Sequence, residues 1–68
     1  MKAWSVVDEI VGEELSVNSY FDALVMADQR VAVHGQEFKY GKACNVHLPV
    51  KCKVIEDKER RKVTIVAK

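Results

Sequence analysis

The longest regular pattern in the chain is an alternation of apolar and polar side chains between residues 44 and 54. The even positions are apolar: Cys44, Val46, Leu48, Val50, Cys52 and Val54. Because successive side chains of a strand point to opposite faces, this pattern predicts one long strand over residues 44–55, with a buried face and a wet, basic face. Pro49 cannot donate a ladder hydrogen bond, so we expect it at a sheet edge or a bulge.

Three shorter alternations complete the predicted sheet. Val63, Ile65 and Ala67 are in phase, so residues 62–67 should return as the partner of the long strand after a charged turn at residues 57–61. Val31 and Val33 predict a strand at 30–34, and a second strand at 37–41 should follow a turn at residues 34–37. These four segments predict a four-stranded antiparallel sheet.

The first third of the chain favours helix. Ser19 is a cap-type residue, and Phe21, Leu24 and Val25 after it have the spacing of one helical face, so we expect a helix over residues 19–28. Residues 5–12 fit a second short helix that ends at Gly12, although the valines after Trp4 also suit an edge strand.

The expected fold class is therefore α+β, with one or two short N-terminal helices packed on the antiparallel sheet. The alternative assigns residues 19–28 to a strand that places Phe21, Ala23, Val25 and Ala27 on one face. The chain would then form a small five-stranded barrel of the OB or SH3 type. Residues 53–65 also resemble the closing hairpin of OB-fold RNA-binding modules.

Composition is that of one small globular domain spanning residues 1–68. The chain is 49% hydrophobic and 31% charged, with a single proline and no apolar run long enough to cross a bilayer. Met1 to Trp4 lack the features of a signal peptide, so we expect a cytoplasmic protein without a membrane partner. Cys44 and Cys52 lie far apart along the predicted strand, which favours two reduced thiols.

Charge is divided unevenly along the chain. Residues 1–30 hold two basic and six acidic side chains, a net charge of −4, whereas residues 31–68 hold nine basic and four acidic ones, a net charge of +5. Segments of opposite sign either attract one another within the fold or present two faces to different partners.

Residues capable of catalysis or metal binding are few and poorly placed. Cys44 and His47 would point to opposite faces of the predicted strand, which argues against a zinc site and against a cysteine–histidine pair. The acidic cluster around Glu9 is expected to be solvated, with no pocket to shift a pKa. The sequence predicts no enzyme, no metal and no cofactor.

Two surfaces could bind macromolecules. A basic strand and loop could follow a phosphate backbone, with one aromatic ring to stack on a base. Its candidate residues are Lys39, Tyr40, Lys42, Lys51, Lys53, Arg60, Arg61 and Lys62. An acidic segment, or an exposed sheet edge, could instead engage a basic or strand-donating protein. The candidate residues for that surface are Trp4, Asp8, Glu9, Glu13, Glu14 and Tyr20.

The resulting hypothesis is a small non-enzymatic binding or regulatory protein that acts through protein–protein contacts. Another protein is the expected partner, and self-association through the sheet would give a homodimer. The alternative hypothesis is a nucleic-acid-binding module that uses the basic C-terminal hairpin.

Overall fold

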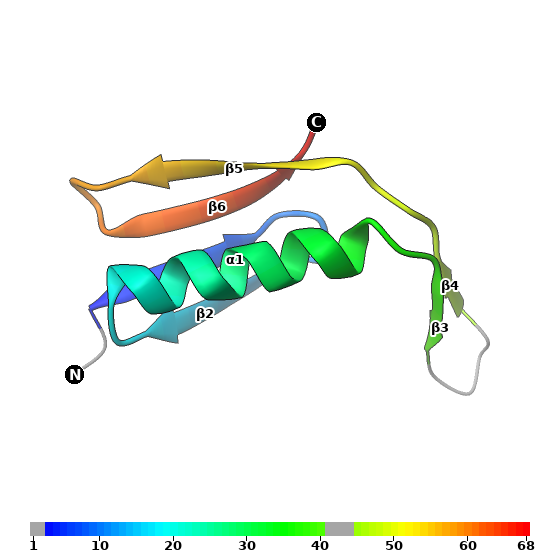
Figure 1. Ribbon diagram of the computed structural model, residues 1–68, viewed down its shortest axis with the longest axis horizontal. Helices are drawn as coiled ribbons and strands as arrows, with labels where there is room; N and C mark the ends of the chain where they lie inside the picture. Colours follow the sequence, from blue (N-terminus) through cyan, green and yellow to red (C-terminus); the bar gives the residue numbers. More distant parts are fainter. Residues whose placement is uncertain (1–2, 41–44) are drawn as a thin grey trace.

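Two β-hairpins and a helix form the body of the protein in a computed structural model (Figure 1). The structure describes residues 3–40 and 45–68. The elements in chain order are β1 (Trp4–Asp8), β2 (Glu13–Val17), α1 (Tyr20–His34), β3 (Phe38–Tyr40), β4 (Asn45–His47), β5 (Cys52–Asp57) and β6 (Lys62–Ala67). α1 is not long and apolar enough to cross a membrane, and no other helix is described.

The main sheet is mixed, with the strand order β2-β1-β6-β5. Each hairpin is antiparallel, and the hairpins meet where β1 runs parallel to β6, with Val6 beside Val63 and Asp8 beside Ile65. Gly12, at φ 75°, forms part of the tight β1–β2 turn, where its left-handed backbone is favourable only for glycine. The sheet stays open, so β2 and β5 are its two edges.

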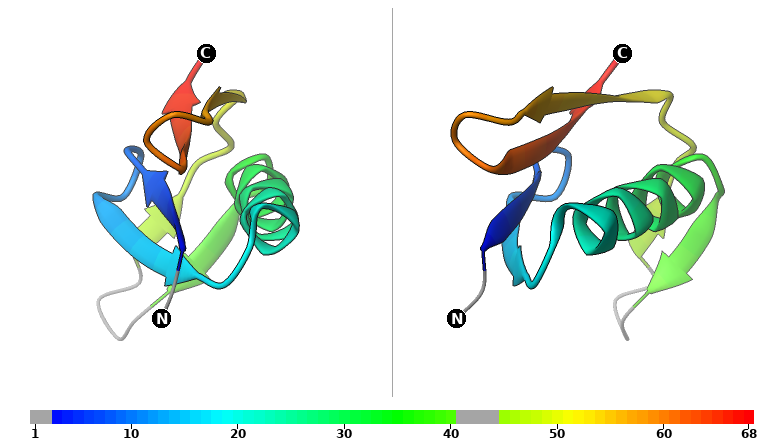
Figure 2. Two further views of the ribbon diagram at one scale, coloured as in Figure 1. Left: turned by 90° about the vertical axis from the view of Figure 1, so that its left-hand side faces the viewer. Right: turned by 60° about the vertical axis from the view of Figure 1, so that its left-hand side comes forward.

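α1 covers one face of this sheet (Figure 2). Its N-cap is Ser19, whose hydroxyl accepts a hydrogen bond from the Asp22 amide at 3.2 Å, and Gly35 caps its C-terminus. Ala23 and Ala27 are one turn apart and fully buried, so the helix backbone can approach the strands closely. No described element covers the other face of the sheet.

The buried core between helix and sheet is small. Its buried hydrophobic residues are Val6, Val17, Ala23, Ala27, Val63 and Ile65. Val7, Thr64 and Val66 alternate with the core residues of β1 and β6 and therefore point to the uncovered face. Core volume is scarce in so short a chain, and each of these side chains should contribute strongly to stability.

The α+β class is confirmed, but the arrangement of the sheet differs from the prediction. The protein has one helix where one or two were expected, and the sheet contains a parallel pair where all strands were expected to be antiparallel. Residues 5–12, predicted as a helix, form β1 and the turn after it. The four-stranded sheet does not close into the alternative barrel.

The predicted strand at residues 30–34 is wrong, because these residues form the last turn of α1. The helix predicted over 19–28 is correct and continues to His34. Val31 and Val33 carry the alternation that suggested a strand, yet valine lowers helix propensity by only a few tenths of a kcal/mol, which tertiary packing overrides. The predicted strand at 37–41 is the shorter β3, which pairs with β4 in a separate sheet.

The single long strand predicted over 44–55 is two strands. β4 and β5 are separated by residues 48–51, which include Pro49. Val46 and Leu48 are exposed, so the expected buried face does not extend through them. Cys52 is a free thiol, and Cys44 lies outside the described residues. The hairpin of β5 and β6 is close to the prediction.

Val63→Ala should be one of the most destabilising truncations in the chain. Val63 is 0% exposed, and removing two buried methyl groups should lower the free energy of unfolding by about 2 kcal/mol. The matched control is Val11→Ala in the β1–β2 turn, where a side chain 48% exposed should cost less than about 0.5 kcal/mol. Urea unfolding measures both, and equal losses would contradict the assigned core.

Candidate functional site

A chain of three side chains links the end of β1 to the end of α1 and to β4. Asp8 Oδ2 lies 2.6 Å from His34 Nε2, and His34 Nδ1 lies 3.1 Å from His47 Nε2. Asp8 and His34 are 1% and 2% exposed, whereas His47 is half-buried. His47 also stacks on Phe38 of β3, with ring centroids 4.4 Å apart. These contacts of His47 hold the β3–β4 hairpin against the end of α1.

Several donors converge on the Asp8 carboxylate. Its Oδ1 accepts hydrogen bonds from the amides of Ile10 and Val11 in the β1–β2 turn. Arg30 from α1 lies 3.5 Å from Oδ2 and also forms a two-pronged contact with Glu13, at 3.2 and 3.3 Å. The turn, the helix and β2 are therefore all tied to one buried charge.

These donors decide the protonation of Asp8. Burial alone would raise the pKa of Asp8, but the hydrogen bond and charge of His34 and the two backbone amides outweigh it. The net result is a pKa below the ordinary value of 3.8. Asp8 is therefore an anion at neutral pH, buried among its partners.

The hydrogen bond to Asp8 places one ring proton of His34. A carboxylate only accepts, so His34 Nε2 carries the proton shared with Asp8. His34 Nδ1 and His47 Nε2 share one further hydrogen bond, whose donor depends on the tautomers of the two rings. Among the described residues, no group of three or more histidine, cysteine, aspartate or glutamate side chains could hold a metal ion.

The sequence did not predict this arrangement. Asp8 was expected to belong to a solvated acidic cluster. In the structure it is buried beside His34, which is 26 residues away in the sequence. One signal was present, because Asp8 is in phase with Val6 and so faces the same side of β1 as the core.

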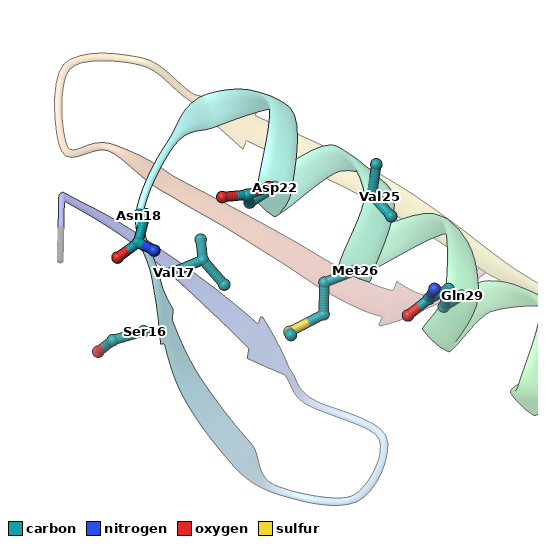
Figure 3. Close-up of a pocket in the computed structure, with 7 residues that line it drawn as sticks. All are labelled: Ser16, Val17, Asn18, Asp22, Val25, Met26 and Gln29. Carbon is teal, nitrogen blue, oxygen red and sulfur yellow. The ribbon is translucent and has the colours of Figure 1, made fainter.

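A second feature is a groove of about 360 Å³ between α1 and the edge strand β2 (Figure 3). Val17 of β2 and Val25 and Met26 of α1 form its apolar part. Its remaining lining is polar: Ser16, Asn18, Asp22 and Gln29. Among the described residues that line this groove, none is basic, and Asp22 is the only charged one.

The residues predicted to bind protein occupy different environments. Trp4 and Tyr20 are half-buried and pack together, with ring centroids 4.9 Å apart, and the Tyr20 hydroxyl donates to Glu56. This hydrogen bond, followed by burial and the charge of Glu56, raises the pKa of Tyr20. Glu9, Glu13 and Glu14 are exposed, Glu13 in its contact with Arg30.

The residues predicted to bind nucleic acid fall into separate groups. Lys53 and Lys62 are in phase with the uncovered face of the sheet, and Arg60 and Arg61 are in the β5–β6 turn. Lys39 and the backbone of Tyr40 belong to β3, at the opposite end of the long axis (Figure 1). Lys51 is exposed before β5, and Lys42 lies outside the described residues.

Comparisons with known proteins give no family assignment. No protein-family model matches the chain, and neither does any curated protein or solved structure. We therefore infer the function from the geometry of these surfaces.

Asp8→Asn should lower the free energy of unfolding by about 2 kcal/mol at pH 7, because it removes a buried charged acceptor. Since the folded-state pKa of Asp8 is lowered, its contribution is present above pH 3.8 and is lost as the pH falls through the folded-state value. The difference between the variant and the parent should therefore shrink in acid. Urea unfolding between pH 7 and pH 3 measures it.

Glu9→Gln provides the control for Asp8→Asn, since it removes an exposed carboxylate next in the chain. It should change stability by less than about 0.5 kcal/mol at any pH. A pH-independent cost of Asp8→Asn would show that the Asp8 charge does not stabilise the fold.

Proposed function

We propose that this chain is a non-enzymatic protein-binding module that receives an extended, basic segment of a partner along the edge of β2. The observation that carries the proposal is the groove between β2 and α1, which has apolar side chains and a carboxylate in its lining. An open strand edge beside such a groove suits β-strand addition, in which the main chain of the edge gives affinity and the groove accepts alternate side chains.

Three properties of this edge support strand addition. β2 pairs only with β1 in the described sheets, so its outer side has backbone groups available to a partner. Val25 is 41% exposed in the groove, where an apolar side chain of the partner would cover it. Glu14 on β2 and Asp22 in the groove are exposed carboxylates, which favour lysine or arginine in the partner.

An exposed aromatic side chain at the start of α1 provides a further contact for the same partner segment. Phe21 is 71% exposed in the first turn of α1, one helical turn before Val25. Exposed aromatic side chains beside a groove are frequent centres of binding energy. The partner segment would therefore lie along β2 and reach the start of the helix.

Selection from a displayed library of random ten-residue peptides should enrich basic sequences with alternating apolar residues. Val25→Arg should weaken binding of a selected peptide by about tenfold or more, because it fills the groove and repels the basic segment. Fluorescence anisotropy with the labelled peptide measures the dissociation constants.

Val33→Arg is the matched control, because Val33 is a valine of the same helix with a similar exposure of 47% and lies outside the groove. It should leave peptide affinity within about twofold. A library without enrichment, or selected peptides that bind the parent and Val25→Arg equally, would contradict strand addition at β2.

Nucleic-acid binding is the second candidate function, and one juxtaposition favours it. The Lys58 ammonium lies 5.5 Å from the centre of the Tyr20 ring, which packs against Trp4. Arg60 and Arg61 are exposed in the same turn as Lys58. Aromatic rings beside a cationic turn could stack on a base while the turn contacts phosphates.

The double variant Lys58→Gln with Arg61→Gln tests this second function. If the turn contacts phosphates, log affinity for oligothymidine should fall with log salt, and the slope should shrink by about 0.7 for each phosphate that the variant no longer neutralises. Lys39→Gln, at the other end of the molecule, should leave the slope unchanged. No retention of oligothymidine by the parent at low salt would eliminate the function.

A further inference from the structure

β5 is the second free edge of the sheet, and its side chains form a self-complementary pattern. Its sequence is CKVIED, and both central residues are exposed, Val54 by 38% and Ile55 by 48%. Charged residues on an edge strand normally discourage pairing with another chain. On β5 the charges have opposite signs on either side of Ile55, with Lys53 two residues before it and Asp57 two residues after it.

We propose that β5 pairs antiparallel with β5 of a second copy of this chain, across a two-fold axis at Ile55. The two sheets would then continue into one of eight strands, with both helices on the same face. This interface is at the opposite edge from β2, so its failure would leave the proposed peptide groove untouched.

Backbone geometry supplies the required hydrogen-bonding groups. The Lys68 amide donates to the Lys51 carbonyl at 2.8 Å, in register with the β5–β6 ladder. Hydrogen-bonded pairs alternate along an antiparallel ladder, so Lys53, Ile55 and Asp57 direct their backbone groups toward β6. Val54 and Glu56 therefore direct theirs to the free edge.

Two-fold symmetry restricts the register. An axis perpendicular to the sheet keeps each face on its own side, so a residue must oppose its own equivalent at the centre. With Ile55 at the centre, Val54 opposes Glu56 of the second copy, and both have outward backbone groups. The symmetry repeats this pair, so the two strands can exchange a complete set of hydrogen bonds.

Charge selects this register over the neighbouring one. With Ile55 at the centre, Lys53 opposes Asp57 of the second copy on the uncovered face, and symmetry repeats the pair. With Val54 at the centre, Lys53 would oppose Ile55, and Cys52 would oppose Glu56. With Ile55 at the centre, Lys53 therefore pairs with an opposite charge, and only Glu56 faces an uncharged residue, Val54. With Val54 at the centre, both Lys53 and Glu56 face uncharged residues.

Lys53→Glu should weaken the dimer, because each glutamate would oppose Asp57 of the second copy. Sedimentation equilibrium of the full chain should show a parent dimer whose dissociation constant rises by about tenfold or more in Lys53→Glu. Lys51→Glu makes the same change in net charge at an exposed site before β5, and it should change the constant by less than about threefold. A parent that remains monomeric at about 1 mM, or equal effects of both variants, would overturn the proposal.

Disulfide cross-linking tests the register independently, in a chain that carries Cys44→Ser and Cys52→Ser. Ile55→Cys would face itself in a pair without hydrogen bonds, where Cβ atoms are about 5 Å apart, close to disulfide range. It should form covalent dimers under mild oxidation. Val54→Cys would face Glu56 and should not. Cross-linking through Val54→Cys alone, or through neither variant, would overturn the register, and circular dichroism confirms that each variant is folded.

Discussion

The buried pair of Asp8 and His34 is the interaction on which the rest of this small structure depends. The Asp8 carboxylate accepts hydrogen bonds from the His34 imidazole at the end of α1 and from two amides of the β1–β2 turn. The Arg30 guanidinium lies slightly farther away. One charge therefore fixes where the helix ends relative to the first strand. His47 extends the same connection to β4, so the β3–β4 hairpin, which lies beyond the main sheet, is held to the helix (Figure 1).

The strength of this pair comes from complete hydrogen bonding. A buried carboxylate without partners would be costly, and the fold avoids this because every described buried side-chain nitrogen and oxygen atom has a partner. A described core of six buried hydrophobic residues leaves little stability in reserve, so specific polar contacts should have a large influence on which arrangement is adopted. Several exposed apolar side chains lie on the edge strand β5 and on the surface of α1, which contribute to the two proposed interfaces.

Local patterns in the sequence predicted the elements better than their pairing. The Ser19 cap, the 3-4 spacing after it and the alternation at residues 62–67 correctly indicated α1 and β6. The valines at positions 6 and 7 fit both a helix and a strand, and the pairing of β1 with β2 and β6 decides between them. The Asp8–His34 pair joins residues that are distant in sequence, and β1 had first to be recognised as a strand. Periodicity alone could not provide that contact, nor the groove between β2 and α1.

Nuclear magnetic resonance of the histidine side chains in ¹⁵N-labelled protein can show whether Asp8 and His34 form this buried pair. At pH 7 we expect His34 to carry a slowly exchanging proton on Nε2, donated to Asp8, with close contacts to protons of β1 and of His47. His34 with its only ring proton on Nδ1, or a ring proton that exchanges freely with water, would contradict the buried pair and the arrangement of β1, α1 and β4 around it.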